Sequence, residues 1–229
     1  MSAAMTLASC GGTKDAGQQQ DAAALIQRSD IKIEGKRMTP EALWAMGRIG
    51  SVAVSPDEKQ IAYTVSYYSV PQNKSNSEVF VMNADGSGNT QITHDAWQEG
   101  QPTWFKDGKK LAFLCNESGS SQVWEMNPDG SNPRQVTDIP DGINGYVYAP
   151  DMSKIVYLKD VQLEPTVQDL YPDLPKAKAR IVDDQFYRHW NDWVDAYTHL
   201  FIADYVPAQP ITTGKDIMEG ERWESPVRP

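Results

Sequence analysis

Positive charge, cysteine and long apolar runs are all scarce in this sequence. Lysine and arginine total 21 residues against 31 aspartates and glutamates, which leaves a net charge of −10. Nucleic-acid binding requires a basic face, so this balance argues against nucleic acid as a partner. The cysteines, Cys10 and Cys115, are too few for a disulfide framework. No apolar run approaches the length that spans a bilayer.

Sequence motifs for catalysis and metal binding are also missing. The nucleophile-elbow pattern G-x-S-x-G does not occur, and the glycines beside Ser87 and Ser120 have the character of turn residues. The histidines, His94, His189 and His199, are not paired at metal-ligand spacing. The Asp-Gly pairs lack the D-x-D-x-D-G spacing of a calcium loop. The sequence therefore predicts no catalytic residue, no metal and no cofactor in this chain.

The dominant positive feature is an internal repeat. A turn at Asp57 recurs 50 residues later at Asp107 and 44 residues after that at Asp151, and the Asp85-Gly86 pair recurs 44 residues later at Asp129-Gly130. Each unit holds four short apolar runs joined by turn residues, which is the size of one propeller blade. We therefore expect an all-β fold, a partial β-propeller of about three four-stranded blades, with a short N-terminal helix and one irregular insertion. A β-sandwich with regular turns is the alternative, although a sandwich does not require the same sequence motifs to recur at a fixed spacing.

The repeat also sets boundaries along the chain. Blades one and two are expected at about 46–95 and 98–139, within a three-blade region that runs from 46 to 229. Blade three begins near Gly142 and is interrupted by the insertion at 159–197. Its third strand is expected at 199–204, and its outer strand at 211–214. Three blades cannot close a ring, because known propellers start at about four blades. We therefore expect the sequence to be a fragment, with further blades and a further domain downstream.

Local signals refine this expectation. In the extension at 22–45, Thr39 is an N-cap candidate and Pro40 and Glu41 suit a first helical turn, so a short helix should precede blade one. Cys115 lies in an apolar strand and should be a buried small hydrophobe. The aromatic residues expected to be substantially buried between blades are Trp104, Phe113, Trp124 and Tyr157.

The first 21 residues suggest a leader and tether. Residues 7–10 read L-A-S-C, which resembles a bacterial lipobox, in which the leader is cut before a cysteine that then carries lipid. The charged start and longer apolar core of a secretory leader are absent, so Met1 is a candidate for a misplaced start. The alternative is a disordered N-terminus with an incidental cysteine. The lipobox interpretation predicts a membrane anchor at Cys10 and a location in the bacterial cell envelope, in the periplasm or as an outer-membrane lipoprotein.

The insertion is the one segment of unusual composition. It places Tyr187, His189, Trp190 and Trp193 within a short stretch that also carries charge. One interpretation is that these aromatics only pack the insertion onto its own blade. The functional alternative is the wall of a substrate cavity, because irregular insertions on a rigid scaffold often carry binding residues. On that interpretation these four residues gate substrate entry.

Several longer sequence motifs resemble those of a known protein family. The helix T-P-E-A-L-W-A-M-G-R-I-G, the strand pair N-A-D-G-S-G-N-T-Q-I-T, and the insertion words Y-P-D-L-P-K and R-H-W-N-D-W resemble the N-terminal part of bacterial prolyl oligopeptidase family serine peptidases. Within that family the sequence is similar to the dipeptidyl peptidase 5 type of Bacteroidales. The resemblance covers about residues 38–229, and the repeats alone are less specific because TolB-type propellers share them.

The resemblance implies that the propeller and the catalytic residues belong to different domains. In that family a propeller caps a C-terminal α/β-hydrolase domain that holds the catalytic Ser, Asp and His, so none of these roles transfers to this sequence. In related dipeptidyl peptidases adjacent glutamates in a propeller insertion hold the substrate's amino terminus, but this insertion has no such pair, and Asp183-Asp184 does not match the motif.

Two functions are therefore open. The first is the substrate-gating part of a secreted serine peptidase that removes dipeptides from peptide N-termini, with peptides as partners and the hydrolase domain continuous with the propeller in the parent protein. The second is a non-catalytic TolB-type propeller that acts as an envelope binding module. This chain alone is expected to be non-catalytic on either interpretation.

Overall fold

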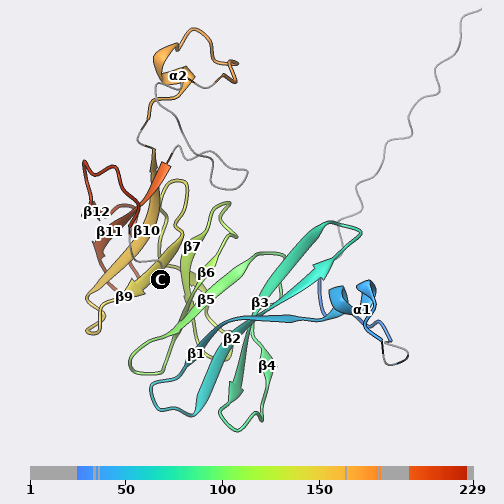
Figure 1. Cartoon of the computed structure of the whole chain (residues 1–229). Helices are drawn as coiled ribbons and strands as arrows, with labels where there is room; N and C mark the ends of the chain where they lie inside the picture. Colours follow the sequence, from blue (N-terminus) through green and yellow to red (C-terminus); the bar gives the residue numbers. More distant parts are fainter. Residues whose placement is uncertain are drawn as a thin grey trace, which may run out of the picture.

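The structure is a computed structural model that describes residues 25–32, 35, 37–162, 164–179, 181 and 196–225. Its strands form three separate four-stranded antiparallel sheets, and within each sheet every strand pairs with its neighbour in sequence. Figure 1 shows the three sheets following one another along the chain as blades. The expected all-β fold of three four-stranded units is confirmed.

Blade one follows a short helix. The helix α1 (Pro40–Ala45) begins as predicted, with the Thr39 hydroxyl oxygen accepting a hydrogen bond from the backbone N–H of Ala42 at 3.2 Å. Such a cap satisfies an otherwise unpaired backbone donor and contributes about 1 kcal/mol. The strands of blade one are β1 (Arg48–Val54), β2 (Gln60–Ser69), β3 (Lys74–Asn83) and β4 (Thr90–Gln91).

Blade two repeats this order with shorter middle strands. Its strands are β5 (Glu99–Trp104), β6 (Leu111–Cys115), β7 (Gln122–Met126) and β8 (Arg134–Gln135). Every residue of β6 is buried, which fits its unbroken apolar sequence L-A-F-L-C, and Cys115 is among them as expected.

Blade three contains the insertion. Its strands are β9 (Gly145–Tyr148), β10 (Lys154–Gln162), β11 (Ala196–Asp204) and β12 (Lys215–Asp216). The pairing of β10 with β11 continues outward as far as Gln162 and Ala196. The interruption between the paired strands is therefore 163–195, shorter than the 159–197 expected, because backbone pairing continues past Lys159, Asp160 and Gln162, which break the apolar pattern. A further short helix, α2 (Val167–Leu170), lies within it.

The outer strand of blade three differs from the prediction. Residues 211–214 were expected there, but the outer strand is β12, in which Lys215 and Asp216 pair with Ile202 and Phe201 of β11. Ile211 instead bridges to Thr137 beyond β8 of blade two. The expectation was wrong because an I-T-T triplet fits an edge strand by composition, while its actual partner is set by a longer loop after β11.

The predicted turns are confirmed and share one mechanism. Turns lie at 56–57, 84–86, 106–108 and 128–130. In each, the aspartate side chain accepts a hydrogen bond from the backbone N–H two residues later, which stabilises the turn locally. Asp151 does the same for Ser153 at the third repeat.

Two apolar clusters join the blades. One lies between blades one and two and includes Val79, Leu111 and Phe113, and the other lies between blades two and three and includes Val123 and Tyr157. Burial of a side chain such as Leu111, which is 0% exposed, contributes about 1.5–3 kcal/mol. Of the aromatics expected there, Trp104, Phe113 and Tyr157 are buried, and Trp124 is partly buried against the first cluster. Among the described helices, neither is long and apolar enough to cross a membrane.

Candidate functional site

The blades have two distinguishable ends. In an antiparallel meander the start of the first strand, the turn between the second and third strands, and the end of the fourth strand lie together. A parallel bridge between Ser77 and Gln98 joins this end in blades one and two, and a hydrogen bond from the Ile143 N–H to the Ser121 carbonyl at 2.9 Å joins it in blades two and three. The insertion leaves blade three from the same end, which we call the insertion end (Figure 1).

The described part of the insertion presents apolar side chains to solvent. Its helix α2 begins at a capping box, in which the Thr166 hydroxyl and the Asp169 carboxylate each accept a hydrogen bond from the other residue's backbone N–H. Four large apolar residues of the insertion are between 44% and 50% exposed: Leu170, Tyr171, Leu174 and Ile181. Exposed apolar side chains gathered on an irregular loop are typical of a contact surface.

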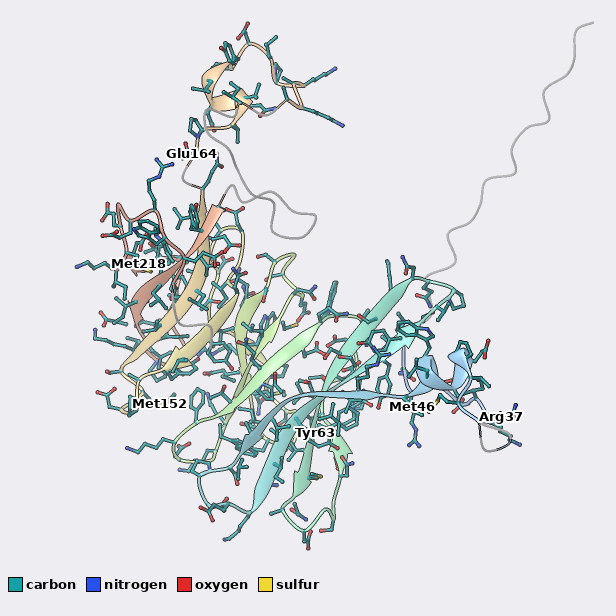
Figure 2. All side chains as sticks on the ribbon, in the orientation of Figure 1. Arg37, Met46, Tyr63, Met152, Glu164 and Met218 are labelled. Atoms are coloured by element: carbon teal, nitrogen blue, oxygen red, sulfur yellow. The ribbon has the colours of Figure 1, made fainter. Side chains whose placement is uncertain are left out.

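A salt bridge attaches the insertion to the last described segment of the chain. The Arg222 guanidinium pairs with the Glu164 carboxylate. Glu164 lies where the insertion leaves the blade, and Figure 2 labels it there. The base of the insertion is therefore tied to residues that follow β12.

The residues predicted to gate substrate entry, Tyr187, His189, Trp190 and Trp193, lie outside the described residues. The predicted lipidation site, Cys10, lies outside them as well.

A stacked arginine occupies the insertion end of blade one. The Arg48 guanidinium carbon lies 4.9 Å from the ring centre of Trp44 and 4.5 Å from that of Tyr68. The two rings meet edge to face at 5.4 Å. Cation–π contacts of this kind contribute about 0.5–1 kcal/mol at an exposed site. They fix α1 against β2 and hold one cation in a defined position.

A buried cluster of polar groups joins blades one and two at the same end. Glu78 lies in the buried part of β3, Glu99 begins β5, and Thr93 follows β4; all three are at most 9% exposed. The Thr93 hydroxyl oxygen lies 2.6 Å from Glu78 Oε2 and 3.3 Å from Glu99 Oε2. Asn76 donates a hydrogen bond to Glu78 Oε1 at 2.7 Å. Two carboxyl groups from different blades are thus bridged by one hydroxyl.

Burial dominates the electrostatics of this cluster. Desolvation, with hydrogen bonds from Thr93 partly opposing it, raises the pKa of Glu78 to about 7. Desolvation and the negative charges of Asp95 and Glu78 raise the pKa of Glu99 to about 10. Desolvation also raises the pKa of Cys115 to about 12. At neutral pH the Cys115 thiol is therefore protonated and unreactive.

A pocket of about 250 Å³ opens beside the cluster. Its lining combines Glu99 and Cys115 with the aromatic rings of Phe113 and Trp124 and the acidic residues Asp95 and Glu117. The indole N–H of Trp124 is buried and has no hydrogen-bond partner. The pocket is acidic and partly aromatic, and it lies toward the outer strands of blades one and two rather than on β1.

The described residues do not form a nucleophilic catalytic centre. Attack by serine or cysteine requires a base within hydrogen-bond reach. Of the described histidines, His199 pairs through Nδ1 with Asp216 at 2.8 Å, and neither it nor His94 is hydrogen bonded to a hydroxyl or thiol. Within the described ranges, no group of three His, Cys, Asp or Glu side chains is placed to hold a metal ion.

Sequence reasoning missed the Glu78–Glu99 cluster. A signal was present in the repeat itself, because the position 44 residues after Glu78 is Gln122. An exchange of a carboxylate for an amide between equivalent repeat positions marks a site where one blade carries charge and the next does not.

Comparison with known proteins identifies curated relatives. The chain is 45% identical over 195 residues to a dipeptidyl-peptidase 5 of Porphyromonas gingivalis, a match that covers 85% of this chain and 28% of the relative. It is 42% identical over 196 residues to a dipeptidyl-peptidase 5 of Porphyromonas endodontalis, covering 86% of this chain and 28% of that relative. The chain therefore spans less than a third of the length of these relatives.

A solved structure and a family model agree on the fold. An acylaminoacyl peptidase of Pyrococcus horikoshii superimposes with a TM-score of 0.54 at 15% identity, covering 76% of this chain and 26% of that one. At that identity the likeness concerns the fold alone. Residues 31–188 match the family model of the TolB beta propeller domain. With three four-stranded blades and a sequence related to the propeller part of the Porphyromonas enzymes, the chain belongs to the TolB beta propeller domain family.

Proposed function

We propose that this chain is the substrate-gating propeller part of a serine peptidase that removes dipeptides from peptide N-termini. The observation that carries the proposal is the 45% identity to a dipeptidyl-peptidase 5 across 85% of the chain. The chain spans only 28% of that relative, and its described residues hold no activated nucleophile. We therefore assign the chemistry to a hydrolase domain in the part of the relative that this sequence does not span.

The gating role is assigned to the insertion. A propeller is a rigid scaffold, and an irregular loop on its end can screen what approaches without disturbing the core. The exposed apolar residues around α2 suit contact with peptide side chains. We extend this surface to Tyr187, His189, Trp190 and Trp193, which follow in the same insertion. Their role is binding and selection of peptides rather than bond breaking.

The proposed location is the bacterial cell envelope, with a lipid anchor on Cys10. The support is the L-A-S-C motif followed by a polar stretch. A polar tether of this kind behaves as a flexible linker between a membrane and a folded domain. Peptides produced outside the cytoplasm would then reach the propeller directly.

A second candidate is a non-catalytic envelope binding module. The match of residues 31–188 to the TolB beta propeller domain favours it, because the family is described as a propeller domain and not as a peptidase. On this interpretation the insertion end binds a protein or peptide ligand, and no hydrolysis accompanies binding.

Peptidase assays separate the two functions. The full-length product of the natural gene and the 229-residue chain are assayed on fluorogenic dipeptide substrates, each with a free and with an acetylated amino terminus. The peptidase proposal expects turnover of the free substrate by the full-length protein only. Cleavage of acetylated substrates in preference to free ones contradicts dipeptide removal from a free N-terminus. A full-length protein inactive on all substrates supports the binding module.

A further inference from the structure

The hydrogen bonds around Thr93 indicate how many protons the carboxyl groups of the buried cluster hold. Its hydroxyl oxygen accepts a hydrogen bond from the Val79 backbone N–H at 2.9 Å and lies 2.6 Å from Glu78 and 3.3 Å from Glu99. A hydroxyl carries one proton, so it can donate to only one of the two carboxyl groups. The second carboxyl group faces a lone pair and interacts favourably only if it carries a proton of its own.

The remaining contacts indicate which carboxyl group is ionised. Glu78 receives donors at both oxygens, from Thr93 at 2.6 Å and from the Asn76 amide at 2.7 Å, as an ionised carboxylate prefers. At Glu99 the Cys115 thiol is a weak donor, with 3.6 Å between Sγ and Oε1, and a side-chain hydrogen bond with the carboxyl group of Asp95 raises the pKa of Glu99 further. The short, well-donated bonds at Glu78 and the long bond at Glu99 assign the negative charge to Glu78 and the proton to Glu99.

Among the residues that the structure describes, no positive charge compensates this pair. None of the interactions that shift the pKa of Glu78 or Glu99 comes from a lysine or an arginine. Two buried carboxylates without a cation would be strongly destabilised by desolvation and by mutual repulsion. A proton is the remaining means of neutralising one of them.

Among the described residues, the titratable side chains around the pair are carboxyl groups, a thiol, a phenol and one histidine. Glu78 and Glu99 are faced by Tyr67 of β2, by His94 and Asp95 of the β4–β5 linker, by Cys115 of β6, and by Glu117 of the β6–β7 turn. The nearest arginine effect is that of Arg28 on Tyr67. The surroundings therefore reinforce retention of the proton.

We propose that Glu78 and Glu99 hold one shared proton across Thr93 at neutral pH, and that loss of this proton loosens the junction of blades one and two. The junction then acts as a pH-sensitive element of the propeller. It lies at the insertion end, so loosening moves the linker that carries Asp95 and the wall of the adjacent pocket.

The direction of the pH effect follows from the shifts. Both glutamates have a folded-state pKa above the ordinary value of 4.5, about 7 for Glu78 and about 10 for Glu99. Such a group contributes stability fully at pH below its unfolded pKa and loses it as the pH rises through its folded pKa. The junction is thus most stable in mildly acidic solution and weakens toward alkaline pH.

Blade two shows that carboxyl groups are not required for the architecture. At the position equivalent to Glu78, Gln122 accepts hydrogen bonds from the Thr137 hydroxyl at 2.8 Å and the Ile139 N–H at 3.1 Å. The residue 44 positions after Glu99 is Ile143, which is 2% exposed. A neutral amide and an apolar residue thus suffice at the next junction. The acidic pair therefore makes the stability of the first junction depend on pH, although the fold itself does not require acidic residues there.

The test uses Glu99→Gln in the full 229-residue chain, with Glu117→Gln as the matched control. A glutamine amide can donate to Thr93 in place of the acid proton, so the variant keeps the bond and removes the titration. Infrared difference spectra at about pH 8.5, where Glu78 is ionised and Glu99 keeps its proton, should show the carbonyl stretch of a protonated carboxylic acid in the wild type. That band should be missing in Glu99→Gln and retained in Glu117→Gln.

Denaturation between pH 7 and 9 provides the second readout. The folded-to-unfolded ratio of the wild type should fall by up to about tenfold per pH unit more than that of Glu99→Gln. Equal pH dependence of the two proteins, or a wild type without the protonated-acid band at about pH 8.5, overturns the proposal. If Glu99→Gln does not fold, the infrared pH titration of the wild type decides the question, because the band must disappear between pH 7 and alkaline pH.

Discussion

Tyr205 of blade three donates its hydroxyl hydrogen to Glu125 of blade two, with 2.8 Å between Oη and Oε2. The other Glu125 oxygen accepts hydrogen bonds from Lys110 at 2.7 Å and from Arg134 at 2.8 Å. The buried acid of this second junction is therefore compensated by two cations, in contrast to the pair at the first junction. The two junctions of one propeller should respond to pH in opposite directions.

Replacing Glu125 with alanine should destabilise the chain. The change leaves Lys110, Arg134 and Tyr205 without their common acceptor. We expect a loss of about 3 kcal/mol, at the low end for breaking a buried charge pair because the Lys110 side chain stays 41% exposed. Urea denaturation measures the loss. Glu219→Ala, at an exposed position, is the control and should change stability little; an equal loss in both variants would contradict the assignment.

Glu125 should also confer sensitivity to acid. Burial opposes its ionisation, but the hydrogen bonds from Lys110, Tyr205 and Arg134 outweigh that effect and lower its pKa below the ordinary 4.5. Its stabilisation is present above the unfolded pKa and is lost as the pH falls through the folded pKa. Thermal denaturation between pH 5 and 3 should show a steeper decline for the wild type than for Glu125→Gln. Parallel declines would show that this carboxylate does not titrate with unfolding.

Two equivalent turn glycines should differ in tolerance to alanine. Gly86 and Gly130 have nearly the same positive φ, +84° and +83°, which costs an alanine about 1–2 kcal/mol. A Cβ at Gly86 meets nothing within 4 Å, whereas one at Gly130 comes within 2.5 Å of the Ile92 carbonyl oxygen in blade one. Gly130→Ala should therefore cost about 1–3 kcal/mol more than Gly86→Ala, from overpacking between blades. Thermal denaturation of both variants compares them directly, and equal midpoints would mean that the two turns are not distinguished by this contact.

Within the proposed peptidase, Trp190→Ala in the full-length protein should raise KM more than it lowers kcat. This is the pattern expected when a side chain binds substrate and transition state equally. Trp223→Ala, which removes an exposed tryptophan outside the insertion, is the control and should leave both constants unchanged. Steady-state kinetics on dipeptide substrates decides the matter. A fall in kcat at unchanged KM would place Trp190 in the chemical step instead.

The proposed lipid anchor predicts a modified N-terminus. When the natural full-length gene is expressed in a bacterial host, mass spectrometry should find a mature chain that begins at Cys10 with lipid attached. A Cys10→Ser variant should lose both the modification and membrane fractionation. An uncleaved, unmodified peptide spanning residues 8–14 would reject the anchor.

Local chemistry made much of the fold predictable. Thr39 caps its helix and Asp57, Asp85 and Asp129 fold their turns through bonds that span two or three residues, so a linear pattern reveals them. Cys115 is buried because its whole strand is apolar.

Features that depend on residues far apart in the chain could not be predicted from the sequence. Glu78 and Glu99 meet only because blades one and two pack together, and neither residue is near the other in a strand pattern. The position of Ile211 depends on how far the chain travels after β11 before it returns to the sheet. The predicted gating residues at 187–193 lie outside the described residues, so their placement stays a prediction.

The hydrogen bonds between Ile211 and blade two allow the docking of blades two and three to be measured directly. The Ile211 amide donates to the Val136 carbonyl, and the Asp138 amide donates to the Ile211 carbonyl, each at 2.8 Å. These amides are protected from solvent only while the two blades are docked, whereas amides within a sheet are protected whenever that sheet is formed. Their hydrogen-exchange rates therefore measure separation of blades two and three independently of the unfolding of either blade.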